Sequence, residues 1–195
     1  ISTAIFGSKK MISNFSNISK CKLSVLSGII IGLSYPPSPF GFLAWFGLIP
    51  LIHVLFSSSI GDSIKWSFVT GLIVNVITVY WFGLNSGAGV VPALISMFAA
   101  ILYLSIFWIL FGFLSSWYNK ITGHGLSLFP LICVFTEFLR GFGPLSFPWI
   151  NLALTQTFCL PLVQIADVTG SMGISFCIVL LNVIIYTAIR SKNVE

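Results

Sequence analysis

The sequence predicts an all-α membrane protein, a polytopic bundle of about six transmembrane helices with a Pro-rich outer segment between the fifth and sixth. Hydrophobic residues make up 57% of the 195-residue chain and charged residues 7%, whereas a soluble domain carries about 25% charged residues. The mean hydropathy is +1.05. The surface of a soluble fold needs polar cover, so this composition indicates a lipid environment.

The first two helices are predicted to form an antiparallel pair. Residues 1–22 are polar and are interpreted as a cytoplasmic N-terminal segment. The apolar run 23–33 ends at the prolines of 36–39, which stop a helix, and a second apolar run covers 40–56. A cleaved signal peptide is the alternative for the first run, but Ser34-Tyr35-Pro36 is a poor cleavage site and more apolar runs follow.

Four further apolar runs complete the transmembrane domain, which covers residues 23–190 and leaves 191–195 as a cytoplasmic tail. A spanning helix needs about 20 mostly apolar residues. The predicted spans three to six are 64–82, 90–117, 126–139 and 170–189. Residues 140–162 contain Pro144, Pro148 and Pro161 and form the Pro-rich outer segment.

The basic residues predict the orientation. With a cytoplasmic N-terminus, six spans leave only Arg140 of the nine basic residues on the outer side. The other eight are Lys9, Lys10, Lys20, Lys22, Lys65, Lys120, Arg190 and Lys192. This asymmetry follows the positive-inside rule, so we expect both ends of the chain in the cytoplasm. No basic stripe forms, and we therefore expect no nucleic-acid partner.

The strongest candidate site is the segment Thr136-Glu137-Phe138-Leu139-Arg140-Gly141, followed by Phe147-Pro148-Trp149. Glu137 and Arg140 are three positions apart, so they share one face of a helix. An acid near the hydrocarbon is costly unless it is paired, so it is a functional candidate. An ion pair that only holds the helix end is the alternative. Phe147–Trp149 is interpreted as an interfacial aromatic turn or as a re-entrant segment covered by protein.

These residues resemble the signature of bacterial apolipoprotein N-acyltransferases. The Glu-Phe-Leu-Arg-Gly and Phe-Pro-Trp pieces carry the resemblance, Gln156 also fits, and the turn at 32–37 resembles the first hairpin of the family. The resemblance covers about residues 23 to 190. Three residues depart from the family pattern. Ala153-Leu154 stand where Gly-Tyr is frequent, and Ser146 stands where Gly is common.

The resemblance implies an enzyme of the bacterial inner membrane. Such an enzyme transfers an acyl chain from a phospholipid donor to the α-amine of the N-terminal diacylglyceryl cysteine of an apolipoprotein. In this family a nitrilase-like domain supplies a Glu-Lys-Cys triad, whose thiol carries the acyl group as a thioester. The sequence ends at Glu195 without such a domain, so we expect the membrane half of an acyltransferase, without a catalytic residue and inactive alone.

The resemblance also suggests roles for four substrate-binding residues. Arg140 is expected to face an anionic head group, because a guanidinium pairs well with phosphate, and Glu137 to orient Arg140. Phe147 and Trp149 are expected to line the entrance for the acyl chain. No nucleotide-binding or zinc-binding motif occurs, so we expect neither a cofactor nor a metal.

Other polar residues have mainly structural interpretations. Asn75 is expected to form an interhelical hydrogen bond, Asp167 to be a helix N-cap or a solvated loop residue, and His53 to be a packed, neutral side chain. The four cysteines, Cys21, Cys133, Cys159 and Cys177, lack CxxC spacing and are interpreted as buried small hydrophobes. A small transporter or channel, and a non-catalytic membrane scaffold, are the alternative functions.

Overall fold

The computed structural model describes residues 19–85, 87 and 89–191, and every regular element within them is a helix, which confirms the all-α prediction. The α-helices are α2 (Lys20–Leu33), α3 (Ala44–Gly47), α4 (Ile49–Phe56), α5 (Ile60–Val79), α6 (Val90–Thr122), α7 (Gly125–Arg140) and α8 (Leu160–Ser191). The 3-10 helices are η1 (Gly41–Leu43), η2 (Tyr80–Leu84), η4 (Pro148–Ile150) and η5 (Leu152–Gln156). Residues 1–18 of the expected N-terminal segment and 192–195 of the expected tail lie outside the described residues.

Among the described helices, three are long and apolar enough to cross a membrane. They are α5 together with η2, α6 and α8. The helices α2 and α7 have 14 and 16 residues, which is short of the usual length of about 20. The helices therefore support a membrane protein, whereas the count of six spans stays a prediction.

The expected second span over 40–56 is not one helix but the succession η1, α3 and α4. Pro50 in the first turn of α4 favours a break between α3 and α4, and a side chain of α8 stabilises it. Asn182 accepts a hydrogen bond from the Leu48 backbone N–H at 3.0 Å and donates one to the Ala44 carbonyl oxygen at 2.9 Å. These bonds satisfy buried backbone groups where the helical pattern is interrupted.

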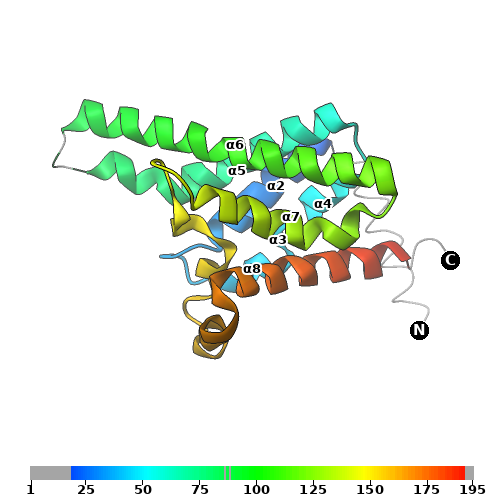
Figure 1. Cartoon of the computed structure of the whole chain (residues 1–195). Helices are drawn as coiled ribbons and strands as arrows, with labels where there is room; N and C mark the ends of the chain where they lie inside the picture. The colour runs from blue at the N-terminus through cyan, green and yellow to red at the C-terminus, as the bar shows by residue number, and fades with distance from the viewer. Residues whose placement is uncertain (1–18, 86, 88, 192–195) are drawn as a thin grey trace.

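The long helices pack closely through small residues. The helices α5 and α6 run antiparallel side by side, α2 packs against α5, and α7 lies between α6 and α8 (Figure 1). Gly71 of α5 lies against Trp108, and Gly112 of α6 lies against Ser67. A Cβ atom added at either glycine would come within 2.3 Å of its neighbour. In membranes, small residues at helix contacts let two backbones approach each other.

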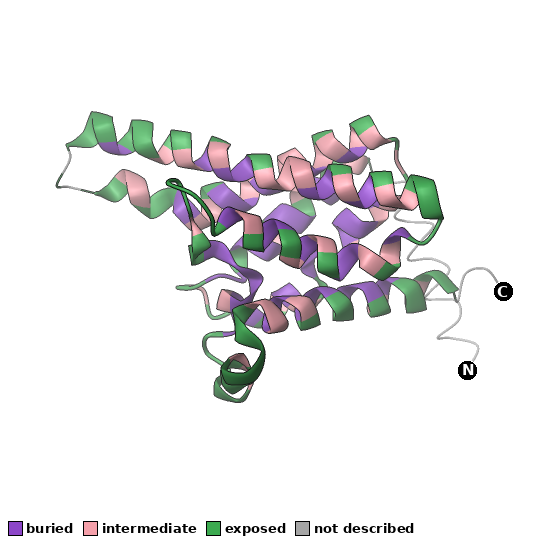
Figure 2. Cartoon of the chain, in the orientation of Figure 1, coloured by how far each residue is buried: buried purple, intermediate pink, exposed green. Residues whose placement is uncertain are grey.

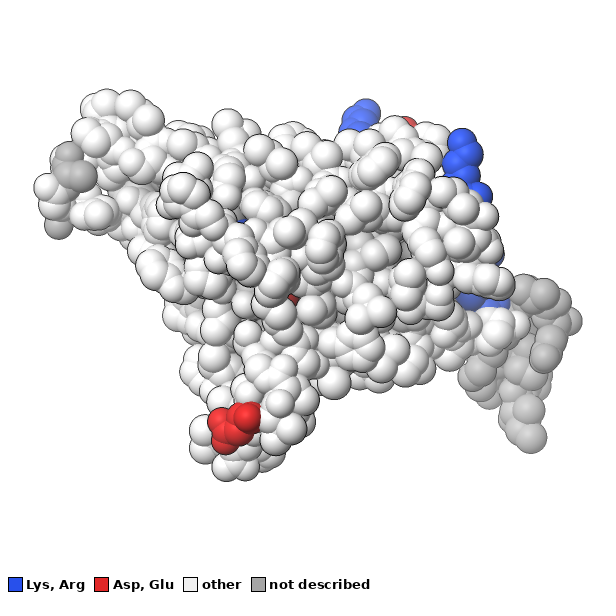
Figure 3. Space-filling model, viewed as in Figure 1, with Lys and Arg blue, Asp and Glu red and all other residues white. Residues whose placement is uncertain are grey.

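The two ends of the bundle differ in charge. The basic end, at the right of Figure 1, contains the first turns of α2, α5 and α7 and the last turns of α4, α6 and α8. Its described basic residues are Lys20, Lys22, Lys65, Lys120 and Arg190. Figure 3 shows blue side chains at this end, one red acidic group at the lower edge of the view, and little charge over the rest of the visible face. At the opposite end lies Arg140, which is buried.

The chain after α7 differs from its prediction. Residues 140–162 were expected as a Pro-rich outer segment and the sixth span from residue 170, but α8 already begins at Leu160. At Gly170 the backbone has φ 68° and ψ 176°, a conformation open mainly to glycine, and here α8 bends so that residues 160–169 project from the bundle (Figures 1 and 2). Asp167 is exposed within this projecting helix, so its assignment to an N-cap or a loop is wrong.

Candidate functional site

The last turn of α7 presents two charged side chains to the interior of the protein. Glu137 and Arg140 are only 6% and 5% exposed. Both are buried from the same face of α7, as their spacing predicts. The direct ion pair between them, which was the alternative to a functional role, does not form. Within the described residues the ion pair is Lys20–Asp62, at the basic end.

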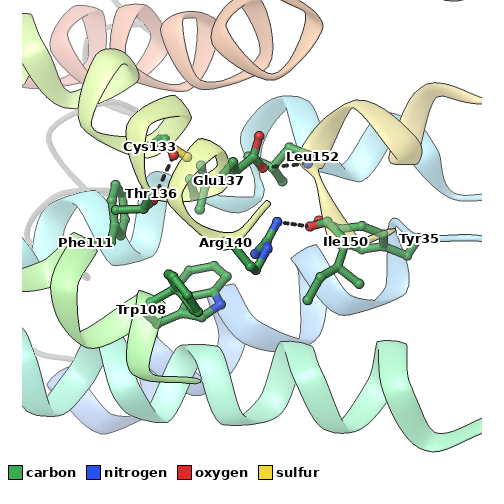
Figure 4. A pocket seen from close by; sticks show the side chains of 11 residues that line it. Tyr35, Trp108, Phe111, Cys133, Thr136, Glu137, Arg140, Ile150 and Leu152 are labelled. Atoms are coloured by element: carbon green, nitrogen blue, oxygen red, sulfur yellow. Dashed lines mark hydrogen bonds between the residues drawn. The ribbon is translucent and has the colours of Figure 1, made fainter. Parts of the chain in front are cut away.

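Both side chains instead bind the backbone at the junction where η4 ends and η5 begins. Glu137 Oε1 accepts a hydrogen bond from the Leu152 backbone N–H at 2.7 Å. Arg140 Nη2 donates to the Ile150 carbonyl oxygen and to Asn151 Oδ1, each at 2.9 Å. Figure 4 shows the two side chains leaving the same helix toward Leu152 and Ile150. Buried backbone groups need hydrogen-bond partners, and these two side chains supply them at the junction.

Residues from other elements complete this arrangement. Tyr35, just after α2, donates its hydroxyl proton to the Ile150 carbonyl oxygen at 2.9 Å. Ser175 of α8 accepts a hydrogen bond from the Ala153 backbone N–H at 3.0 Å. We call the side chains of Tyr35, Glu137, Arg140 and Ser175 the polar brace, because together they bind the backbone of residues 150–153.

Gln156 links the end of η5 to the region before α4. Its Nε2 donates to the Gly41 carbonyl oxygen at 2.9 Å, and its Oε1 accepts from Trp45 Nε1 at 3.0 Å. A Cβ atom at Gly41 would lie 2.0 Å from the Thr155 carbonyl oxygen, so the two segments touch through their backbones. Gln156, which fits the family pattern, thus connects η5 to η1 and α3 through hydrogen bonds.

The polar brace places Phe147 and Trp149 beside a groove. Trp149 is 62% exposed and Phe147 is partly buried. The Phe147 ring lies 5.4 Å from the Trp149 ring and 5.7 Å from the Phe82 ring, between centroids. The groove has a volume of about 470 Å³. Its lining is Phe82, Ser96, Ala99, Ala100, Tyr103, Pro144, Leu145, Ser146, Phe147 and Trp149, and we call it the aromatic groove.

The remaining candidates lie apart from this site. Asn75 Nδ2 donates to Ser105 Oγ at 3.0 Å between α5 and α6, which confirms the interhelical bond. Of the cysteines, Cys133 alone is buried, next to the polar brace, whereas Cys21, Cys159 and Cys177 are exposed. The interpretation of all four as buried hydrophobes is therefore wrong for three of them, because apolar side chains on a bundle in lipid need not point inward.

Sequence reasoning did not assign a site role to Tyr35, Asn151 or Ser175. Tyr35 lies 115 residues from its partner Ile150, so no local pattern connects the two. The one available signal was polarity, since each of these residues interrupts an otherwise apolar or Pro-rich stretch.

A family model described as the apolipoprotein N-acyltransferase N-terminal domain matches residues 27–184. The chain belongs to this family. The match includes the complete polar brace and the complete aromatic groove. The identification that the Glu137, Arg140 and Trp149 motif suggested is thereby confirmed.

Curated apolipoprotein N-acyltransferases of several bacteria are similar to the chain. The protein of Geobacter metallireducens is 34% identical over 175 residues, which cover 86% of the chain and 33% of that protein. The protein of Thermotoga maritima is 32% identical over 183 residues, or 88% of the chain and 36% of that protein. The protein of Pasteurella multocida is 27% identical over 168 residues, or 84% and 32%. The chain spans about a third of the length of these relatives.

Proposed function

We propose that the chain is the membrane domain of an apolipoprotein N-acyltransferase, which transfers an acyl chain from a phospholipid to the α-amine of the N-terminal diacylglyceryl cysteine of an apolipoprotein. Family membership supports the reaction class. The observation that carries the role of this domain is the aromatic groove, an apolar recess on a protein with membrane-spanning helices. Its volume lies within the range of about 300–1,000 Å³ that is common for small-molecule sites.

Phe147 and Trp149 contact the acyl chain in this proposal. Their rings form one wall of the aromatic groove, and small residues of α6, such as Ala99 and Ala100, form the other. A wall of small side chains leaves room for a flexible chain, and the aromatic rings supply a large apolar contact area.

Glu137 and Arg140 act as positioning residues, because their hydrogen bonds hold the segment that follows Trp149. A direct contact of Arg140 with a phospholipid head group stays a prediction. Its Nη2 is already bound to Ile150 and Asn151, so a head group would have to use another of its N–H groups.

The membrane topology forms part of the proposal. We place the basic end at the cytoplasmic face of the inner membrane and the aromatic groove toward the outer leaflet, with six crossings and both ends of the chain inside. The positive-inside rule supports this orientation, since the five described basic residues other than Arg140 lie at the basic end.

A phospholipid with a photoreactive group near the end of one acyl chain tests the groove. The chain is reconstituted in nanodiscs that contain this lipid, irradiated and digested, and labelled peptides are measured by mass spectrometry. We expect labelling of the 141–150 segment, and a decrease of at least about fivefold in Trp149→Ala. Trp117→Ala is the matched control, since Trp117 is an exposed tryptophan of α6 near the basic end. Equal labelling in both variants would contradict acyl-chain binding in the groove.

A chimera tests the reaction. The chain replaces the corresponding third of the Geobacter metallireducens relative, and acyl transfer from phospholipid to a diacylglyceryl-cysteine peptide is measured. Transfer that Trp149→Ala abolishes and Trp117→Ala preserves would support the proposal. A folded chimera without transfer would favour the scaffold, and solute flux through liposomes containing the chain would favour the transporter.

A further inference from the structure

Two atoms of the polar brace have no hydrogen-bond partner among the described residues, although both are buried. They are Oε2 of Glu137, whose carboxylate also lies close to the Ser175 hydroxyl, and Nε of Arg140. One is an acceptor of a carboxyl group and the other is an N–H donor of a guanidinium group. Buried polar atoms without a partner are rare in native proteins, because each loses its hydrogen bonds to water.

Both residues line the same cavity (Figure 4). The cavity has a volume of about 40 Å³ and lies between α7, α6 and the segment bound by the polar brace. The residues that line it are Tyr35, Leu48, Phe107, Trp108, Phe111, Cys133, Thr136, Glu137, Arg140, Ile150 and Leu152. A cavity needs at least about 10–15 Å³ of such space to hold one water molecule, so this cavity has room for at least one.

The chemistry of the lining restricts the occupant. Glu137 Oε2 requires a donor and Arg140 Nε requires an acceptor, and water is a small neutral molecule that supplies both. The hydroxyl groups of Tyr35 and Thr136 donate their protons to the carbonyl oxygens of Ile150 and Cys133, so the lone pairs of both hydroxyl oxygens are available to a further donor. A buried water typically forms about three hydrogen bonds, and these four groups provide that number.

We propose that this cavity is a hydration site, in which ordered water accepts a hydrogen bond from Arg140 Nε and donates one to Glu137 Oε2. The water joins the two charged side chains through one molecule or a short chain, in place of a direct ion pair. It thereby completes the polar brace on the side away from Ile150 and Leu152. This inference depends only on the brace and the cavity, and not on the proposed acyltransferase role.

A high-resolution structure of the chain in nanodiscs tests the site directly. We expect density within about 2.7–3.2 Å of Arg140 Nε and, directly or through a second peak, of Glu137 Oε2. Well-ordered side chains around a cavity without density would overturn the proposal. A direct contact between the carboxylate and Nε would overturn it as well.

The substitution Cys133→Leu provides a second test, because Cys133 lines the cavity and is buried. Added apolar volume displaces water and leaves the two charged atoms without partners, so we expect the melting temperature to fall by about 5 °C. In a dry cavity the same substitution fills a void and raises the melting temperature. Cys133→Ser is the control of similar volume and should change it by less than about 2 °C.

Overpacking by the leucine is distinguished by a double-mutant cycle with Glu137→Met. If loss of water causes the decrease, Cys133→Leu lowers the melting temperature less in the Glu137→Met background than in the original chain. An equal decrease in both backgrounds would assign the effect to overpacking and contradict the hydration site. If Glu137→Met does not fold, the density in the cavity decides.

Discussion

The two ends of the bundle are built by different physical means. At the basic end, regular helices meet through glycine and serine, as Gly112 does against Ser67, and the charged side chains lie outside. At the opposite end the backbone is irregular, the charged side chains of Glu137 and Arg140 are inside, and large apolar side chains such as Trp149 are exposed. Close helix packing thus stabilises one end, whereas buried hydrogen bonds at the other end hold a surface that is free to contact a ligand.

The largest expected difference between the ends is their accessibility from outside the cell. Cys21 lies in the first turn of α2 and Cys159 lies just before α8, and both are exposed. In variants that keep one of these cysteines and carry alanine at the other three cysteine positions, a membrane-impermeant thiol reagent should label Cys159 at least about tenfold faster than Cys21 in intact cells. Permeabilised cells serve as the control, since both sites should then react. Faster labelling of Cys21 from outside would reverse the proposed orientation.

Arg140→Met should produce the largest loss of stability. It removes the hydrogen bonds to Ile150 and Asn151 and leaves Glu137 without its neighbouring charge. Breaking a buried charged arrangement costs about 3 kcal/mol, which thermal unfolding in detergent measures. Arg190→Met, at an exposed arginine of the basic end, is the matched control and should cost less than about 0.5 kcal/mol. Similar values for the two variants would mean that Arg140 does not hold the segment.

Gly112→Ala should weaken the basic end. The new Cβ atom would lie 2.3 Å from Ser67 Oγ and 2.8 Å from the Ser63 carbonyl oxygen. Overpacking of this kind costs about 2 kcal/mol, again measured by thermal unfolding. Gly61→Ala has the opposite expected sign, because no atom lies within 4 Å of a Cβ there and alanine favours a helix. A stabilising effect of Gly112→Ala would show that α5 and α6 separate easily.

Lys20→Met should have the smallest effect. It breaks the 3.0 Å ion pair with Asp62. The Lys20 side chain is 42% exposed and the Asp62 side chain 45%. Exposed ion pairs contribute about 0–1 kcal/mol and are screened by salt, so we expect a loss below about 0.5 kcal/mol that disappears at high ionic strength. A loss as large as that of Arg140→Met would remove the energetic contrast between the two ends.

The sequence predicts the helices better than it predicts their breaks. Composition indicates membrane helices, and the spacing of Glu137 and Arg140 correctly indicates a common face. The alternative, an ion pair between them, does not form, because the backbone groups of Ile150 and Leu152 bind the two side chains and local spacing does not reveal such partners. Asn182, which stabilises the break between α3 and α4, lies 134 residues from Leu48. Only the tertiary fold brings such partners together.

The unequal lengths of α6 and α7 have a consequence for the surrounding lipid. At 1.5 Å per residue, the 33 residues of α6 extend about 50 Å and the 16 residues of α7 about 24 Å, whereas the hydrocarbon core is about 30 Å thick. Phe135 and Phe138 of α7 and Phe98 of α6 are all exposed. If α7 crosses the bilayer beside α6, the difference in length is met by a thinner bilayer at α7, by a tilt of α6, or by an extension of α6 beyond the hydrocarbon.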